Sequence, residues 1–189
     1  FDISSKKKII LISIKNNFKV SDYENLGAEF YESIKNLKNK EYFINHDSIE
    51  KKNYNFLGYF LHGIKLKSYV FKKYKSKKDN KQFLINIVGT KNKPSVENQQ
   101  KFRALEEGTF FARDLVSEPG NILHPDEYAK RLATLRKFGL KVTIFDEKKL
   151  KKLGMFSLLG VGMGSVRGSY LVTMEWNGLK NNSKPLAFV

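Results

Sequence analysis

Residues 111–125 read FARDLVSEPGNILHP, and this stretch divides the chain into two folding regions. A helix cannot continue through Pro119-Gly120, because proline lacks an amide donor and its ring clashes with the preceding turn. A new helix can begin at Pro125, whose fixed φ angle suits the first helical position, and Asp126 and Glu127 then favour the positive end of the helix dipole. We therefore place a domain boundary between residues 118 and 119.

Upstream of this boundary, residues 94–118 are predicted to form one long helix. Apolar and small side chains recur at intervals of three or four residues, which predicts a single buried stripe along the helix. The stripe consists of Phe102, Leu105, Thr109, Ala112 and Val116. A helix of this size is about 30 Å long, so it can link two domains.

Residues 1–93 show the pattern of an α/β domain. The expected elements are a strand at 9–14, helices at 22–38 and 56–64, and a strand at 83–88. The first helix has Ser21 and Glu24 at the spacing of a capping box. Strands that alternate with helices predict a sheet with at least some parallel pairing.

The α/β pattern restarts in residues 119–189. The expected elements are a helix from Pro125 to a cap at Gly139, a strand at 140–145, a short helix capped by Asp146, a strand at 169–176, and the beginning of a strand at 185–189. The last apolar run reaches the final residue, and the chain does not begin with Met. We therefore expect a truncated part of a larger protein.

Charge is distributed unevenly along the chain. Lys and Arg number 35 against 19 Asp and Glu, for a net charge of +16. Residues 1–93 hold 20 basic and 9 acidic side chains (+11), and the remaining residues hold 15 and 10 (+5). Such asymmetry is typical of a region that binds a polyanion such as DNA. Only five basic residues are Arg, however, and no basic–aromatic motif is present, so we favour a solvated lysine-rich surface over a polyanion-binding region.

Composition also excludes several classes of protein. There is no Cys, which excludes a disulfide framework, a thiolate metal site and a cysteine nucleophile, and which fits a cytoplasmic location. No apolar run approaches the roughly 18–20 residues that a membrane-spanning helix needs, and the N-terminus lacks the order of a signal peptide. We expect no membrane association.

Few residues suggest chemistry by themselves. The three histidines, His46, His62 and His124, lack the spacing of a metal motif. Residues 160–165, Gly-Val-Gly-Met-Gly-Ser, lack the Gly-Lys-Ser/Thr ending of a phosphate loop, and we expect a tight turn between two strands there. The acidic pairs Asp126-Glu127 and Asp146-Glu147 stand at helix starts, where capping explains them. Residue patterns alone therefore indicate a two-part α/β protein without an active site.

Four ordered blocks closely resemble the leucine (cytosol) aminopeptidase family. Residues 112–125 resemble the family signature A-R-D-L-V-N-x-P-x-N-x-L-T-P, with Ser117 in place of Asn and His124 in place of Thr. Residues 142–155 resemble V-x-V-x-D-E-x-x-L-x-x-L-G-M, and residues 160–165 resemble A-V-G-x-G-S. Upstream, residues 69–75 resemble Y-x-F-x-x-Y-K. The resemblance runs from about residue 57 to the end.

The resemblance implies an α/β architecture in three parts. These are a macrodomain-like N-terminal domain (1–93), a linker helix (94–118) and the incomplete first part of a catalytic domain (119–189). It further implies a peptidase that removes N-terminal amino acids from peptide substrates with two divalent metal ions, zinc or manganese, and that assembles as a homo-hexamer.

The family's metal ligands begin in a G-K-G-x-x-F-D-S-G-G segment, directly after a strand that resembles residues 185–189. No family ligand maps onto a position in this sequence. We therefore assign no catalytic, cofactor-binding or metal residue, and we expect these 189 residues to be inactive and to bind no metal. Two alternatives stay open: a basic nucleic-acid-binding or regulatory α/β module, with ADP-ribose binding as a variant, and the folded remnant of a split gene.

Overall fold

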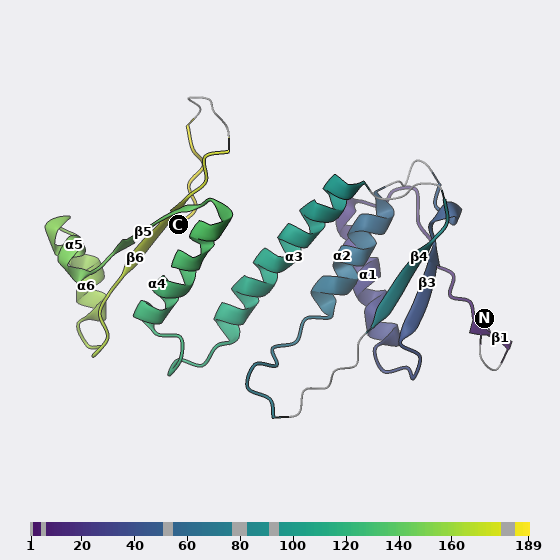
Figure 1. The fold of residues 1–189 in the computed structure, drawn as a ribbon, viewed down its shortest axis with the longest axis horizontal. Helices are drawn as coiled ribbons and strands as arrows, with labels where there is room; N and C mark the ends of the chain where they lie inside the picture. Colours follow the sequence, from purple (N-terminus) through teal and green to yellow (C-terminus); the bar gives the residue numbers. More distant parts are fainter. Residues whose placement is uncertain (1, 5–6, 51–54, 77–82, 91–94, 179–183) are drawn as a thin grey trace. The chain divides into compact units, whose positions relative to one another are not determined.

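A computed structural model of the protein describes residues 2–4, 7–50, 55–76, 83–90, 95–178 and 184–189. The chain forms two compact units, Phe1–Asp114 and Leu115–Val189, and Figure 1 shows the order of their elements. The predicted mixed α/β class is confirmed. The macrodomain-like character of residues 1–93 and the division at residues 93 and 118 stay predictions.

Two helices form the centre of the first unit, and they cross at close range. They are α1 (Val20–Ile34) and α2 (Phe56–Lys67), and they lie side by side in Figure 1. Gly27 of α1 faces the backbone of α2, where a Cβ would lie 2.9 Å from the Phe60 carbonyl carbon. Gly63 of α2 faces α1, where a Cβ would lie 2.7 Å from the Glu24 carbonyl carbon. The crossing therefore depends on two glycines, one from each helix.

Both predicted helices are confirmed, although α1 begins with a different cap. The helix starts at Val20, one residue before Ser21, so Ser21 cannot be its cap. The Lys19 amide donates instead to Asp22 Oδ2 over 2.7 Å. Asp22 has the same three-residue spacing from Lys19 that Glu24 has from Ser21.

A parallel pair of strands lies beside these helices. β3 (Glu41–Asn45) pairs with β4 (Leu84–Val88), with Tyr42 opposite Ile85 and Ile44 opposite Ile87. The predicted strand at 83–88 and the predicted parallel pairing are confirmed. Sequence analysis missed β3, which is short and carries polar residues at both ends. A 3-10 turn, η1 (His46–Ser48), follows β3 directly.

Aromatic side chains dominate the core of the first unit. Phe56, Phe60 and Ile64 of α2 are buried. Phe60 lies 5.1 Å from Phe56 and 5.4 Å from Phe30 of α1 between ring centroids. Aromatic pairs at such distances contribute beyond the apolar area that they bury, so α1 and α2 are held by a ring cluster around their glycine crossing.

The strand predicted at residues 9–14 does not form. Residues 9–15 are extended but belong to no strand, whereas the short hairpin of β1 (Asp2–Ser4) and β2 (Lys7–Lys8) precedes them. Ile12 and Ile14 pack against the helical core, while Leu11 is 73% exposed. The apolar run therefore contributes alternate side chains to the core without a neighbouring strand.

The long helix is confirmed as α3 (Val96–Ser117), although Pro94 lies outside the described residues. Its predicted stripe is partly wrong. Phe102 and Thr109 are half-buried, but Ala112 is exposed, Leu105 is 48% exposed and Val116 is 87% exposed. Contacts from α2 and the segment after it select a neighbouring face of the helix, which carries Phe102, Glu106, Phe110 and Arg113.

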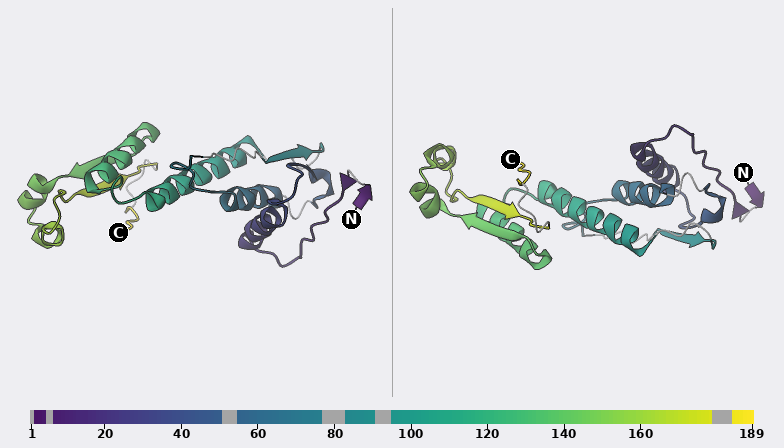
Figure 2. Two further views of the ribbon diagram at one scale, coloured as in Figure 1. Left: turned by 90° about the horizontal axis from the view of Figure 1, so that it is seen from below. Right: turned by 90° about the horizontal axis from the view of Figure 1, so that it is seen from above.

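The second unit packs helices on an antiparallel pair of strands. Its elements are α4 (Pro125–Ala133), η3 (Thr134–Phe138), β5 (Lys141–Phe145), α5 (Glu147–Lys152), α6 (Phe156–Gly162) and β6 (Leu171–Glu175). Val142 of β5 lies opposite Met174 of β6, and both strands can be followed in Figure 2. Leu132 of α4, Val142 of β5 and Leu150 of α5 are buried. The predicted helix at Pro125, the two predicted strands and the helix capped by Asp146 are confirmed.

Two expectations for the second unit are wrong. Gly160 and Gly162 end the short helix α6, so residues 160–165 do not form a tight turn between two strands. Three glycines suggested a turn, but the apolar residues before them continue as helix into the segment. Residues 184–189 form no strand, and Leu186 and Phe188 are almost fully exposed. An apolar run cannot form a strand unless a neighbouring strand receives its hydrogen bonds.

Candidate functional site

The loop that joins α3 to α4 carries the chain's most distinctive sequence. Its backbone folds over Pro119, whose carbonyl oxygen accepts hydrogen bonds from the amides of Ile122 and Leu123, both over 2.9 Å. His124 is extended and precedes Pro125, the first residue of α4. The local sequence thus closes a compact loop and starts the next helix, as the proline and glycine positions predict.

A buried carboxylate fixes this loop to α4. Glu118 is buried, with only 1% of its side chain exposed, and its Oε1 accepts from Arg131 Nη1 over 2.7 Å. Arg131 Nε also donates to Glu127 Oε1 over 3.0 Å, one helical turn away. The hydrogen bonds to Glu118 and then Glu127 raise the pKa of Arg131 above its ordinary value. One guanidinium therefore joins the loop to α4 with charge-assisted bonds.

A second charged group lies at the start of α4. His124 Nδ1 is hydrogen-bonded to Asp126 Oδ1, and Arg167 Nη1 lies 3.8 Å from the same oxygen. Partial burial acts to raise the pKa of Asp126, but the hydrogen bond with His124, the hydrogen bond from its own backbone amide and the nearby Arg167 guanidinium outweigh it, and the pKa is lowered. Asp126 thus joins His124, in the loop before α4, to Arg167, which follows α6.

The two remaining histidines lie in the first unit. His62 Nδ1 lies 3.1 Å from Glu106 Oε1 of α3 and is buried against the Phe102 ring. His46 is 1% exposed, and its Nδ1 has no hydrogen-bond partner; the nearest carboxylate, Asp47 Oδ1, is 3.6 Å away. The structure therefore places the three histidines in three separate surroundings.

The second acidic pair keeps the structural role that sequence analysis gave it. Asp146 Oδ1 accepts from the Lys149 amide over 2.9 Å and caps α5. Glu147 Oε1 accepts from the Ser169 amide over 3.1 Å, which ties α5 to the residues that lead into β6.

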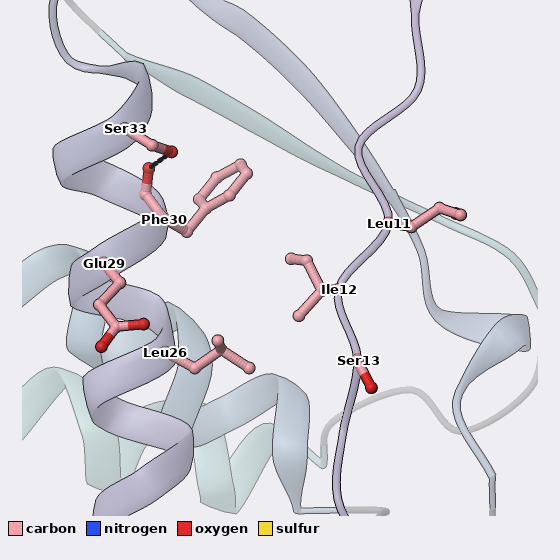
Figure 3. A pocket seen from close by; sticks show the side chains of 7 residues that line it. All are labelled: Leu11, Ile12, Ser13, Leu26, Glu29, Phe30 and Ser33. Atoms are coloured by element: carbon pink, nitrogen blue, oxygen red, sulfur yellow. Dashed lines mark hydrogen bonds between the residues drawn. The ribbon is translucent and has the colours of Figure 1, made fainter. Parts of the chain in front are cut away.

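A shallow pocket in the first unit offers little chemistry. It has a volume of about 410 Å³ and lies between residues 11–13 and α1. Figure 3 shows Ile12, Leu26 and Phe30 pointing toward one another across it, while Leu11 points away. Its polar lining is Glu29 with two serines, and Ser33 Oγ already donates to the Phe30 carbonyl over 2.7 Å. This lining is an apolar surface rather than a catalytic set.

Metal ligands do not cluster in the described parts of the chain. No three His, Asp or Glu side chains there come close enough to hold a metal ion. None of the described helices has the length and apolar character that a membrane span needs. The assignment of no catalytic, cofactor-binding or metal residue stays a prediction.

The Glu118–Arg131 pair was missed by sequence analysis, because opposite charges in a loop and a helix carry no periodic signal.

Sequence comparisons relate the chain to known peptidases. The model of the "Cytosol aminopeptidase family, catalytic domain" matches residues 110–189. A "Probable cytosol aminopeptidase" of Chelativorans sp. is 44% identical over 136 residues, and one of Phytoplasma mali is 42% identical over 137 residues. These alignments cover 67% and 69% of this chain, but 27% and 28% of the relatives. The chain therefore spans about a quarter of their length.

Solved structures share the fold at lower sequence identity. "Bottromycin maturation enzyme BotP in complex with Mn" has a TM-score of 0.68 at 20% identity, over 85% of this chain and 34% of that chain. A mutant of tomato leucine aminopeptidase has a TM-score of 0.67 at 19% identity, over 82% of this chain and 32% of that one. At these identities the likeness shows a common fold.

Proposed function

Because this chain belongs to the cytosol aminopeptidase family, we propose that it is the N-terminal part of a metal-dependent leucyl aminopeptidase. In this proposal the intact protein removes N-terminal amino acids from peptide substrates. The observation that carries it is the alignment at 44% identity over 136 residues with a relative named as an aminopeptidase. That alignment is far longer than any single motif, so it does not depend on one chance match.

Two divalent metal ions, zinc or manganese, are the proposed cofactors of the intact enzyme. The family resemblance supports them, and one structure with the same fold is a complex with Mn. The described residues do not fit such ions, because no three potential ligands meet among them. We therefore assign no step of the reaction to them, and we propose that the 189 residues alone are inactive.

The proposed contribution of these residues is structural. Glu118 and Arg131 join the signature loop to α4, and Glu147 joins α5 to the approach to β6. Arg136 adds a further tie, since its Nε and Nη2 donate to the Val142 carbonyl oxygen over 3.1 and 2.6 Å. These contacts connect the loop to α4, η3 to β5, and α5 to the residues before β6.

Assembly and location are part of the same proposal. We propose a cytoplasmic homo-hexamer for the intact protein, supported by the resemblance and, for the location, by relatives that are named cytosol aminopeptidases. The comparisons give no support to the alternative of a nucleic-acid-binding or regulatory module.

Hydrolysis of leucine amide tests the proposal. Two chains are compared, the 189 residues alone and the same residues extended through the reading frame downstream of the Val189 codon. We expect Mn²⁺-dependent turnover by the extended chain, loss of that turnover in EDTA, and no turnover by the 189 residues. Robust metal-dependent turnover by the 189 residues would refute the proposed inactivity. A folded, metal-loaded and inactive extended chain would refute the peptidase.

A further inference from the structure

Two sequence motifs that lie more than 40 residues apart meet at the end of α3. Tyr69, from the motif after α2, donates from its hydroxyl to Asp114 Oδ1 over 2.7 Å. Arg113 donates from Nη1 to the Leu66 carbonyl oxygen over 2.6 Å. Arg113 and Asp114 belong to the signature at residues 112–125, which begins within α3. The signature therefore contacts both the end of α2 and the motif that follows it.

The contact of Arg113 satisfies a backbone carbonyl at the C-terminal end of α2. α2 ends at Lys67, so the Leu66 carbonyl has no amide one turn further along the helix. A guanidinium suits that position, because it satisfies the carbonyl and places a positive charge at the negative end of the helix dipole.

Ring contacts surround these hydrogen bonds. The Arg113 guanidinium carbon lies 5.4 Å from the centroid of the Tyr69 ring, within the range of a cation–π contact. The Phe110 ring lies 5.2 Å from the Tyr69 ring. The bond from Arg113 to the Leu66 carbonyl is partly buried, so it is less exposed to competing water than a surface pair, whereas the bond from Tyr69 to Asp114 lies at the surface.

We propose that Tyr69, Arg113, Asp114 and the Leu66 carbonyl form a latch that fixes the last turns of α3 to the end of α2. The latch residues of α3 are the final residues of the first unit, and Leu115 begins the second. Leu115, the next residue of α3, is buried, whereas Val116 and Ser117 are exposed. The latch therefore holds α3 against the end of α2 as far as Asp114, ahead of the point where Pro119 and Gly120 end the helix, and this role does not depend on the proposed peptidase activity.

Hydrogen exchange on the intact 189-residue chain tests the latch. In Asp114→Ala and in Tyr69→Phe, we expect the amides of residues 110–117 to exchange about five-fold faster, the effect of losing one hydrogen bond to a charged group. Amides 99–106 keep their wild-type rates. The double variant exchanges no faster than the faster single variant, because both substitutions remove the same bond.

Glu107→Gln is the matched control, since it removes a carboxylate from an exposed ion pair with Arg103 on the same helix. We expect it to leave amides 110–117 unchanged. Three results would overturn the latch: single effects that multiply in the double variant, faster exchange spread evenly along α3, or unchanged exchange in both single variants.

Discussion

The glycine crossing of α1 and α2 makes the sharpest prediction about stability. Gly63→Ala places a Cβ 2.7 Å from the Glu24 carbonyl carbon, and closer still to its oxygen. Ordinary contact begins at 3.4 Å, so the helices must separate by at least 3.4 − 2.7 = 0.7 Å. Both partners are backbone atoms of helices, and neither can turn aside as a side chain can.

Moving α1 away from α2 weakens the side-chain contacts between the two helices. Phe60 and Leu57 of α2 and Ile34 of α1 are almost fully buried beside it. A gap of ~0.5–1 Å forfeits about a quarter to a half of each contact's dispersion energy. Overpacking of this kind costs about 1–3 kcal/mol or more, and alanine's helix propensity returns about 1 kcal/mol. We expect a net loss of about 1 kcal/mol or more.

Urea unfolding measures this loss with an internal reference. Far-UV circular dichroism is weighted toward the first unit, which holds α1, α2 and most of α3, whereas the single tryptophan, Trp176, reports the second unit by fluorescence. Gly63→Ala lowers the midpoint seen by dichroism and leaves the fluorescence midpoint unchanged. Gly108→Ala is the matched control, because that helical glycine has no atom within 4 Å of an added Cβ; it gains roughly 0.5–1 kcal/mol. Equal effects of the two substitutions would refute the close crossing.

Three further predictions concern charge and backbone. Arg131→Leu leaves buried Glu118 without its guanidinium partner and costs about 3 kcal/mol in the fluorescence transition. Arg103→Leu, at an exposed ion pair of the first unit, leaves the dichroism transition almost unchanged; equally large shifts of the two transitions would contradict the buried pair. The pKa of Asp126 is lowered in the folded chain. The ionised carboxylate therefore contributes its full stabilisation of the fold above the ordinary pKa of Asp, and this contribution is lost as the pH falls through the lowered pKa. The stability difference between wild type and Asp126→Asn should therefore vanish in acid, and a difference that persists there would refute the assignment. Gly89→Ala costs roughly 1–3 kcal/mol, since Gly89 has φ +127° and an added Cβ lies 2.7 Å from Asp47 Oδ1. Gly154→Asn, at φ +71° with no atom within 4 Å of an added Cβ, costs less than about 1 kcal/mol. A larger loss for Gly154→Asn than for Gly89→Ala would contradict this prediction.

Elements with strong local signals were predictable from the sequence. Pro125 at a helix start, the carboxylate of Asp146 at a cap and Gly139 in a left-handed conformation each fix a boundary through backbone chemistry alone. The strand at 84–88 was also predictable, because a short β-branched run ends there at glycine. In each case the deciding atoms lie within a few residues of one another.

Elements that depend on distant partners were not predictable in this way. The apolar run at 9–14 has the composition of a strand, but its side chains pack on helices instead. The periodicity of α3 showed which residues share a face, yet contacts from other residues, among them Tyr59, His62 and Tyr69, decide which face is covered. A sequence period carries no information about the side chains that approach from another element.

The candidate site shows the same limit. The family resemblance was found in ordered motifs, and the comparisons confirm it. The pair formed by Glu118 and Arg131 was visible only in the structure, because thirteen residues and a change of direction separate its members. The contact of Tyr69 with Asp114 likewise joins two motifs whose proximity no spacing rule indicates.

The messenger RNA downstream of the Val189 codon tests the central claim most directly. If residues 110–189 are the start of an aminopeptidase catalytic domain, the reading frame continues with Gly-Lys-Gly and, shortly after it, Asp-Ser-Gly-Gly, the family's first metal-binding segment. A transcript whose frame closes at this codon, or continues into unrelated sequence, would contradict the account.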